Sequence, residues 1–154
     1  MEVHGEITSS IIDGALQFYS KNDFSSMAVK KYYSVPFKAD IRVKTSKKNI
    51  HIYYGKGRVT VAQWKPNELR IVDPLLDLDL GYPGPDIEAD QYLDITWILH
   101  KTFTALLING KVYHYGVNYP YMNLGFDLSH QLCIGTVSGT VLTIEKITVS
   151  ELES

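Results

Sequence analysis

Apolar and polar residues alternate along much of the chain with a period of two, which is the period of a β-strand. In segment 37–45 every second residue from Phe37 to Val43 is apolar, and the residues between them are charged. Segment 93–99 also places apolar residues at alternate positions, and Trp97 is one of them. Each pattern predicts a strand with one buried face and one hydrated face, and the second pattern predicts that Trp97 lies in the core.

The dipeptide Asn109-Gly110 separates two further strand-like runs, 102–108 and 111–115. Asn and Gly tolerate the positive φ angles of a type I′ turn, so the dipeptide predicts a tight antiparallel hairpin. A two-residue turn also sets the expected register of the two strands. This register pairs Leu106 with Tyr113 and Thr104 with Tyr115 on one face, and Leu107 with Val112 and Ala105 with His114 on the other.

Similar runs, separated by Gly, Pro, Asn or Asp, continue along the chain at a spacing of roughly ten residues. They occupy 7–10, 15–20, 27–35, 50–54, 58–64, 68–73, 131–137 and 140–149. Because Ile144 and Ile147 do not share one alternation, we expect a β-bulge in the last strand. Segments 74–91 and 116–130 are rich in turn-forming residues and are expected to be irregular. The whole pattern predicts an all-β protein of about twelve strands, an antiparallel two-sheet β-sandwich.

Composition and charge narrow the classes of function. The length of 154 residues suits a single domain over 1–154. The net charge is −2 and no run of Lys and Arg exceeds a pair, which argues against binding of nucleic acid. No apolar run has transmembrane length and residues 1–6 lack the apolar stretch of a signal peptide, so we expect a cytoplasmic protein without a membrane partner. The single cysteine, Cys133, lies in an apolar run and is expected in the core. The oligomeric state stays open.

Five stretches carry a resemblance to a known superfamily. They are Phe-x-Ala-x-Ile-x-Val-Lys-Thr at 37–45, Ile-x-Ile-Tyr-Tyr at 50–54, Asp-Ile-Thr-Trp-Ile at 94–98, Ala-Leu-Leu-Ile-Asn-Gly-Lys at 105–111 and Thr-Ile-x-x-Ile-x-Val-x-Glu-Leu at 143–152. In this order they resemble the concanavalin A-like lectin/glucanase superfamily, of the LamG/jelly-roll type. The resemblance implies a jelly roll of two curved sheets, with ligands on the concave face or at its rim loops. A fold by itself does not determine a function.

Acidic residues gather between positions 77 and 94. Glycosidases of the superfamily carry a Glu-x-Asp-x-Glu strand, and retaining hydrolysis needs two carboxylates roughly 5 Å apart. The nearest match, Asp86-Ile87-Glu88-Ala89-Asp90, has the acids in inverted order and follows Pro85 in a loop. One reading is therefore a solvated acidic loop, and the other is a hydrolase that uses two of Asp86, Glu88, Asp90 and Asp94. No cofactor is expected, with Ca²⁺ as the open alternative because Asp77, Asp79, Asp86, Glu88 and Asp90 offer the oxygen ligands that it prefers.

Aromatic residues form the strongest candidate binding site. Sugars present apolar C–H faces ringed by hydroxyls, so aromatic rings and amides together match them. The candidates are Tyr113, Tyr115, Tyr53 and Trp64 on strands, with Asn118, Tyr119 and Tyr121 in the late loop. The alternative is that these rings serve only packing. No histidines have metal-site spacing, and His100 and His114 are expected on the sheet surface.

Three hypotheses for function follow from these features. The first is a non-catalytic module that binds a carbohydrate or a small polar ligand, as a sensor domain of a larger protein such as a transcription regulator. The second is a glycoside hydrolase of the glucanase type that uses the loop and strand carboxylates. The third is a structural or self-association module. Saturable glycan binding without turnover favours the first, turnover favours the second, and failure of both favours the third.

Overall fold

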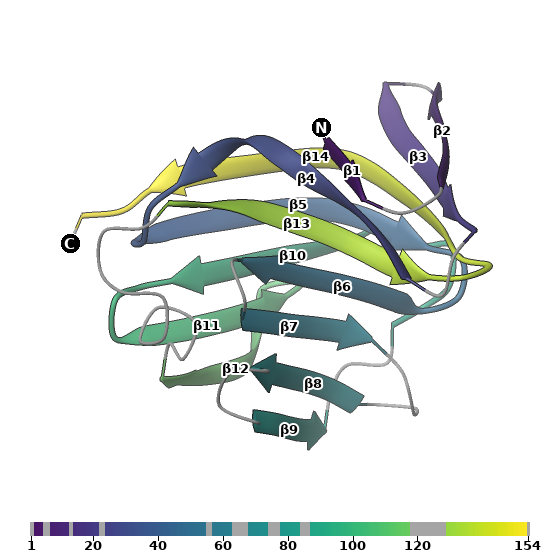
Figure 1. Ribbon diagram of the computed structural model, residues 1–154. Coiled ribbons are helices and arrows are strands. Elements are labelled where there is room, and N and C mark those ends of the chain that lie inside the picture. The colour runs from purple at the N-terminus through teal and green to yellow at the C-terminus, as the bar shows by residue number, and fades with distance from the viewer. Residues whose placement is uncertain are drawn as a thin grey trace.

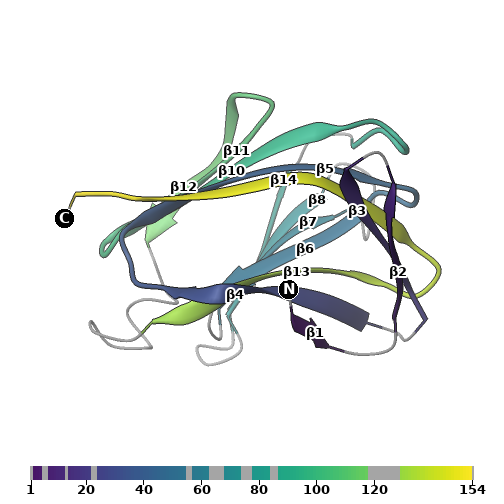
Figure 2. The same cartoon turned by 90° about the horizontal axis from the view of Figure 1, so that it is seen from above.

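The computed structural model describes residues 2–4, 7–12, 14–21, 24–54, 57–62, 68–73, 78–83, 87–117 and 129–153. These residues form fourteen strands in two seven-stranded antiparallel sheets. They contain no helix, and hence none long and apolar enough to cross a membrane. Figure 1 shows one sheet in front of the other, and Figure 2 views the two layers from above. The predicted all-β sandwich is confirmed.

We name the layers the front sheet and the back sheet from their places in Figure 1. The front sheet runs β1 (Glu2–His4), β4 (Phe24–Tyr33), β13 (His130–Val137), β6 (Asn49–Tyr54), β7 (Gly57–Ala62), β8 (Glu68–Asp73) and β9 (Leu78–Pro83). The back sheet runs β12 (Lys111–Val117), β11 (Phe103–Ile108), β10 (Leu93–Leu99), β5 (Phe37–Thr45), β14 (Val141–Glu151), β3 (Ala15–Ser20) and β2 (Ile7–Ile12). The last strand thus lies between strands from the first third of the chain.

The core lies between the sheets, because alternate side chains of each strand point inward. Burial along β5 alternates strictly from Phe37 to Thr45. Trp97 of β10 is 1% exposed, as predicted, and its indole Nε1–H donates to Thr104 Oγ1 at 3.0 Å. That bond satisfies the one polar atom of a large buried ring. Cys133 is also buried, with a free thiol.

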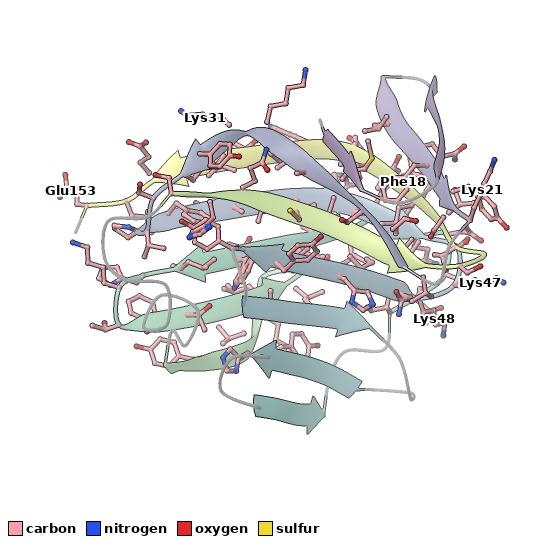
Figure 3. All side chains as sticks on the ribbon, viewed as in Figure 1. Phe18, Lys21, Lys31, Lys47, Lys48 and Glu153 are labelled. Carbon is pink, nitrogen blue, oxygen red and sulfur yellow. The ribbon has the colours of Figure 1, made fainter. Side chains whose placement is uncertain are left out.

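Inward residues of the front sheet complete this core, and charged side chains remain outside. The front sheet contributes Met27, Ile50, Ile52, Tyr54, Leu132 and Ile134. In Figure 3 the labelled lysines and Glu153 lie at the periphery of the molecule. The separation of apolar and charged side chains follows the period of two read from the sequence.

The Asn109-Gly110 turn has the predicted geometry. Asn109 has a φ of 50° and Gly110 a φ of 80°, the two positive angles of a type I′ turn. The backbone N–H of Asn109 donates to the carbonyl of Asp94 at 2.8 Å. The side-chain Oδ1 of Asn109 accepts the N–H of Asp94 at 2.9 Å. The turn is therefore bonded to the start of β10 as well as to its own hairpin.

Beyond the turn, the register of the β11–β12 hairpin differs from the prediction. Leu107 pairs with Val112, as expected, but Leu106 then lies opposite His114. Tyr113 is the extra residue of a β-bulge, a common feature of sheet edges. The predicted pairs Leu106–Tyr113, Thr104–Tyr115 and Ala105–His114 are therefore wrong.

The bulge changes which side chains of β12 point inward. His114 shares the inner side with Leu106 and is buried, so its predicted place on the surface is wrong. Tyr113 packs against the core, whereas Tyr115 pairs with Ala105 and is 70% exposed on the outer face. A Cβ on Gly116 would lie 3.0 Å from the His114 ring, so the glycine leaves room for the inward imidazole. Tyr113 and Tyr115 thus lie on opposite faces of the back sheet.

Two further predictions of irregular structure have different outcomes: the bulge in the last strand is confirmed, and the irregular segment 74–91 is partly wrong. The expected bulge in the last strand is present, because the pairing of β14 with β5 shifts between Ile144 and Lys146. Segment 74–91 was expected to be irregular, but residues 78–83 form β9, which pairs with β8 from Leu78 to Pro83. Proline is tolerated in an edge strand, where its missing N–H has no ladder partner to lose. Pro, Gly and acidic residues are uncommon in strands, so the composition of segment 74–91 did not predict β9.

Replacement of Trp97 by Ala should lower the free energy of unfolding by about 3–5 kcal/mol, because it leaves a large cavity and removes the indole donor from the Thr104 hydroxyl, which keeps its bond to the carbonyl of Ile98. Trp97→Phe keeps most of the ring and should lose less. Denaturant melts of the three proteins measure both differences. A loss below about 1 kcal/mol for the alanine variant would contradict the buried placement.

Replacement of Gly110 by Val should lower the melting midpoint, because a β-branched residue is strained at a φ of 80°. The matched variant Gly110→Asn tolerates this angle better and should lose less. Thermal melts followed by circular dichroism compare the two. Equal midpoints for both variants and the parent would mean that the turn geometry contributes nothing to stability.

Candidate functional site

The predicted site residues do not form one site. Tyr113 points toward the core, Tyr115 lies on the outer face of the back sheet, and Tyr53 lies on the front sheet. The Tyr53 hydroxyl is hydrogen-bonded to Ser26 Oγ at 2.6 Å. Asn118, Tyr119, Tyr121 and Trp64 lie outside the described residues. The structure therefore offers three separate surfaces for the described tyrosines, and their joint role in binding stays a prediction.

One of these surfaces is a cleft that we call the β10–β12 cleft. Its volume is about 310 Å³. Its described lining consists of Ile87, Glu88, Gln91, Tyr92, Leu93, Ile108, Asn109, Lys111 and Tyr113. The antiparallel hairpin brings these residues together, because the start of β10, the end of β11 and the start of β12 meet at the same end of the back sheet.

The segment before β10 forms one wall of the cleft. Ile87 is 3% exposed and anchors the segment in the core. Asp90 has a φ of 58°, and its N–H donates to the carbonyl of Thr45 at 2.9 Å. Beside the segment, the Tyr92 ring lies 5.0 Å from the Arg42 guanidinium carbon and 4.9 Å from Lys44 Nζ. These cation–π contacts hold the orientation of the ring.

The hairpin forms the opposite wall. Tyr113 keeps the inner side that the alternation predicts, and Lys111 Nζ lies 5.2 Å from the centre of the Tyr113 ring. Asn109 uses its Oδ1 to accept the backbone N–H of Asp94. That bond fixes the amide plane and leaves its N–H₂ group to donate elsewhere.

The cleft combines three kinds of surface. Ile87, Leu93 and Ile108 supply apolar area, and Tyr92 and Tyr113 are the aromatic residues of the lining, with the Tyr92 ring lying at the border beside Arg42 and Lys44. Glu88, Gln91, Asn109 and Lys111 supply donors and acceptors around them. Apolar lining with a few convergent polar groups is typical of sites for small molecules. The aromatic rings suit the C–H face of a sugar, and the amides suit its hydroxyls.

Sequence reasoning found Tyr113 and missed Tyr92, Gln91, Asn109 and Lys111 as lining residues. A signal for them existed in the predicted hairpin itself. Antiparallel pairing of 93–99 with the run before Asn109-Gly110 places residue 92 and residue 111 at the same end of the sheet. The predictions for the segment before β10 considered only its acidic residues, as carboxylates for catalysis or as ligands of Ca²⁺.

The acidic residues do not assemble a metal site in the part of the chain that the structure describes. Both carboxylate oxygens of Asp94 accept from Arg42 Nη1, at 3.2 and 3.1 Å, on the outer face. Glu88 lines the cleft, and Asp86 lies outside the described residues. Among the described side chains no group of three or more His, Cys, Asp or Glu is placed to hold a metal ion.

Two histidines titrate abnormally because they are shielded from water. Burial lowers the pKa of His114, which is 7% exposed under β12. Burial also lowers the pKa of His130, whose ring lies edge-on to Tyr54 at 5.3 Å. Both effects arise because an imidazolium ion loses hydration in these places.

Comparison with known proteins identifies the fold. No protein-family model and no curated protein matches the sequence. The structure is similar to a sialidase, with a TM-score of 0.75 at 10% identity over 98% of this chain and 17% of the sialidase. It is similar to the carbohydrate binding module CBM66 from Bacillus subtilis, with a TM-score of 0.69 at 9% identity over 95% and 92% of the two chains. It is also similar to galectin LEC-6 from Caenorhabditis elegans, with a TM-score of 0.60 at 11% identity over 88% and 96%.

These similarities confirm the fold that the resemblance implies, a jelly roll of two sheets. The chain spans 17% of the length of the sialidase that it matches, so it corresponds to one part of that protein. Sequence identities this low are evidence of a shared fold, and they do not identify shared site residues.

The histidine environments predict a loss of stability in acid. The pKa of His114 and of His130 is lower in the folded chain than the ordinary value of 6.5, so the unfolded chain binds protons more strongly. Stability should be complete above pH 6.5 and fall as the pH drops below it. Denaturant melts between pH 8 and pH 5 should show a shallower fall for His114→Phe than for the parent protein. Parallel curves would show that His114 does not contribute.

Proposed function

We propose that this domain is a non-catalytic carbohydrate-binding module whose ligand occupies the β10–β12 cleft. The observation that carries the proposal is the lining of the cleft, which places the inward Tyr113 ring and Tyr92 beside the two amides of Gln91 and Asn109. Support also comes from the fold, which is that of a carbohydrate binding module and a galectin among the similar structures.

A pyranose ring would enter with its apolar face against Tyr113 or Tyr92. Its hydroxyls would accept from Asn109, Gln91 or Lys111 and donate to Glu88, which are the roles that the chemistry of these side chains allows. Ring contact and hydrogen bonding at once make such a site selective for sugars over purely apolar ligands.

The positions of the acidic side chains favour binding without turnover. Asp94 is paired with Arg42 on the outer face, which leaves Glu88 as the acidic side chain that the structure describes in the cleft. Glycoside hydrolysis in its usual form needs a second carboxylate beside the first. A role as the sensor domain of a larger cytoplasmic protein, such as a transcription regulator, stays a prediction from the sequence.

The test begins with a glycan array, followed by calorimetric titration of the sugars that bind. Tyr113→Ala and Tyr92→Ala should each weaken binding roughly tenfold or more, equivalent to ~1.4 kcal/mol. Tyr19→Ala, on β3 and 41% exposed, is the matched control and should bind like the parent. Circular dichroism melts confirm that each variant is folded before titration.

Two outcomes would overturn the proposal. One is the absence of any glycan that binds saturably. The other is full affinity in both folded variants, which would move the site away from the cleft. Release of reducing ends from a bound glycan would show turnover and favour a hydrolase.

A further inference from the structure

A column of stacked rings lies on the outer face of the back sheet, close to its edge. The rings of His100 and Phe103 have centres 4.9 Å apart and planes inclined by 13°. The rings of Phe103 and Tyr115 have centres 5.4 Å apart and planes inclined by 27°. Tyr115 ends the column on the edge strand and is 70% exposed. Its contact with Phe103 is the one ring contact recorded for it among the described side chains.

Apolar surface on this face is concentrated beside Tyr115. Val112 is 57% exposed and lies opposite Leu107, which is itself half-buried. Toward the middle of the sheet the same face becomes charged, where Arg42 pairs with Asp94 and Glu145. A contiguous exposed apolar area with a polar border indicates a contact surface.

The column and the β10–β12 cleft share strand β12. Tyr113 faces the cleft and Tyr115 ends the column, so the bulge directs the two rings to opposite sides of one strand. They are two residues apart, which is roughly 7 Å along a strand. Among the described strands β12 pairs only with β11, so it is an edge strand of the back sheet.

We propose that the ligand is an oligosaccharide chain that crosses the edge of β12, with one unit in the cleft against Tyr113 and a neighbouring unit against Tyr115. This inference rests on the proposed function and extends it, because it names a polymer rather than a single sugar as the ligand.

A glycan fits this edge better than an added peptide strand. Strand addition needs an unbroken row of backbone groups, and the bulge between Val112 and His114 interrupts that row. A sugar chain has no such requirement, and it gains from each ring separately. The hydroxyl of Tyr115 adds a polar contact at the border of the apolar area.

The experiment measures affinity against chain length. Cello-, xylo- and manno-oligosaccharides, each from the monosaccharide to the hexasaccharide, are titrated together with the series that the glycan array identifies. For the parent protein, affinity should rise roughly tenfold from the monosaccharide to the longer chains and then level off. Tyr115→Ala should remove this increase and leave the monosaccharide affinity unchanged. Tyr113→Ala should weaken every length.

Tyr32→Ala is the matched control for Tyr115→Ala, because Tyr32 is 58% exposed on β4 of the front sheet. It should keep the parent dependence on length. Because Tyr115 is mostly exposed, its replacement should not prevent folding.

The outcomes separate this inference from the proposed function. Equal affinity for monosaccharide and hexasaccharide would overturn the inference and leave the binding module intact. A length dependence that Tyr115→Ala does not change would also overturn it. Absence of glycan binding at every length would overturn both. Sedimentation velocity provides a further check, because dissociation of a dimer by Tyr115→Ala with unchanged glycan affinity would assign the surface to a second copy of the chain.

Discussion

The burial of alternate side chains from the neighbouring strands β5 and β10, on the inner side of the back sheet, is the constraint on which the rest of the structure depends. Trp97 lies opposite Ala39 and Leu106 on the inner side of the back sheet, and all three are buried. A shift of either strand by one residue would expose this set and bury charged neighbours such as Arg42. The register of β5, β10 and β11 is therefore held by the core. In the back sheet the register shifts occur in β12 and β14, and in the front sheet one occurs between β13 and β4.

Both bulges redirect side chains toward polar or functional positions. In β14 the shift lies at Glu145, whose carboxylate reaches Arg42 Nε at 3.1 Å. In β12 the shift turns His114 inward and Tyr115 outward, whereas Tyr113 stays on the inner side. The exposed ion pairs of Arg42 contribute little stability individually, since water screens them. Their value lies in holding Arg42 beside the Tyr92 ring at the border of the cleft.

Similarity of fold at such low identity has a physical basis. A jelly roll needs inward apolar residues at every second position and turn residues between the strands, and many sequences meet those requirements. A binding site needs particular side chains at particular places, which the fold leaves open. This is why the structural neighbours show the fold, whereas the β10–β12 cleft follows from the residues of this chain.

The sequence by itself determined the strand pattern, the antiparallel sandwich, the buried position of Trp97, the type I′ turn at Asn109-Gly110 and the irregularity in the last strand. These features are local, because each follows from a period of two or from the φ preferences of a few adjacent residues. Tertiary structure alone decided the bulge in β12, the pairing of β9, and the meeting of Tyr92 with Tyr113. An edge bulge depends on how side chains such as His114 fit beneath the strand, and no alternation records that fit. A cleft joins residues from three separate segments, and their proximity exists only once the sheets have closed around the core.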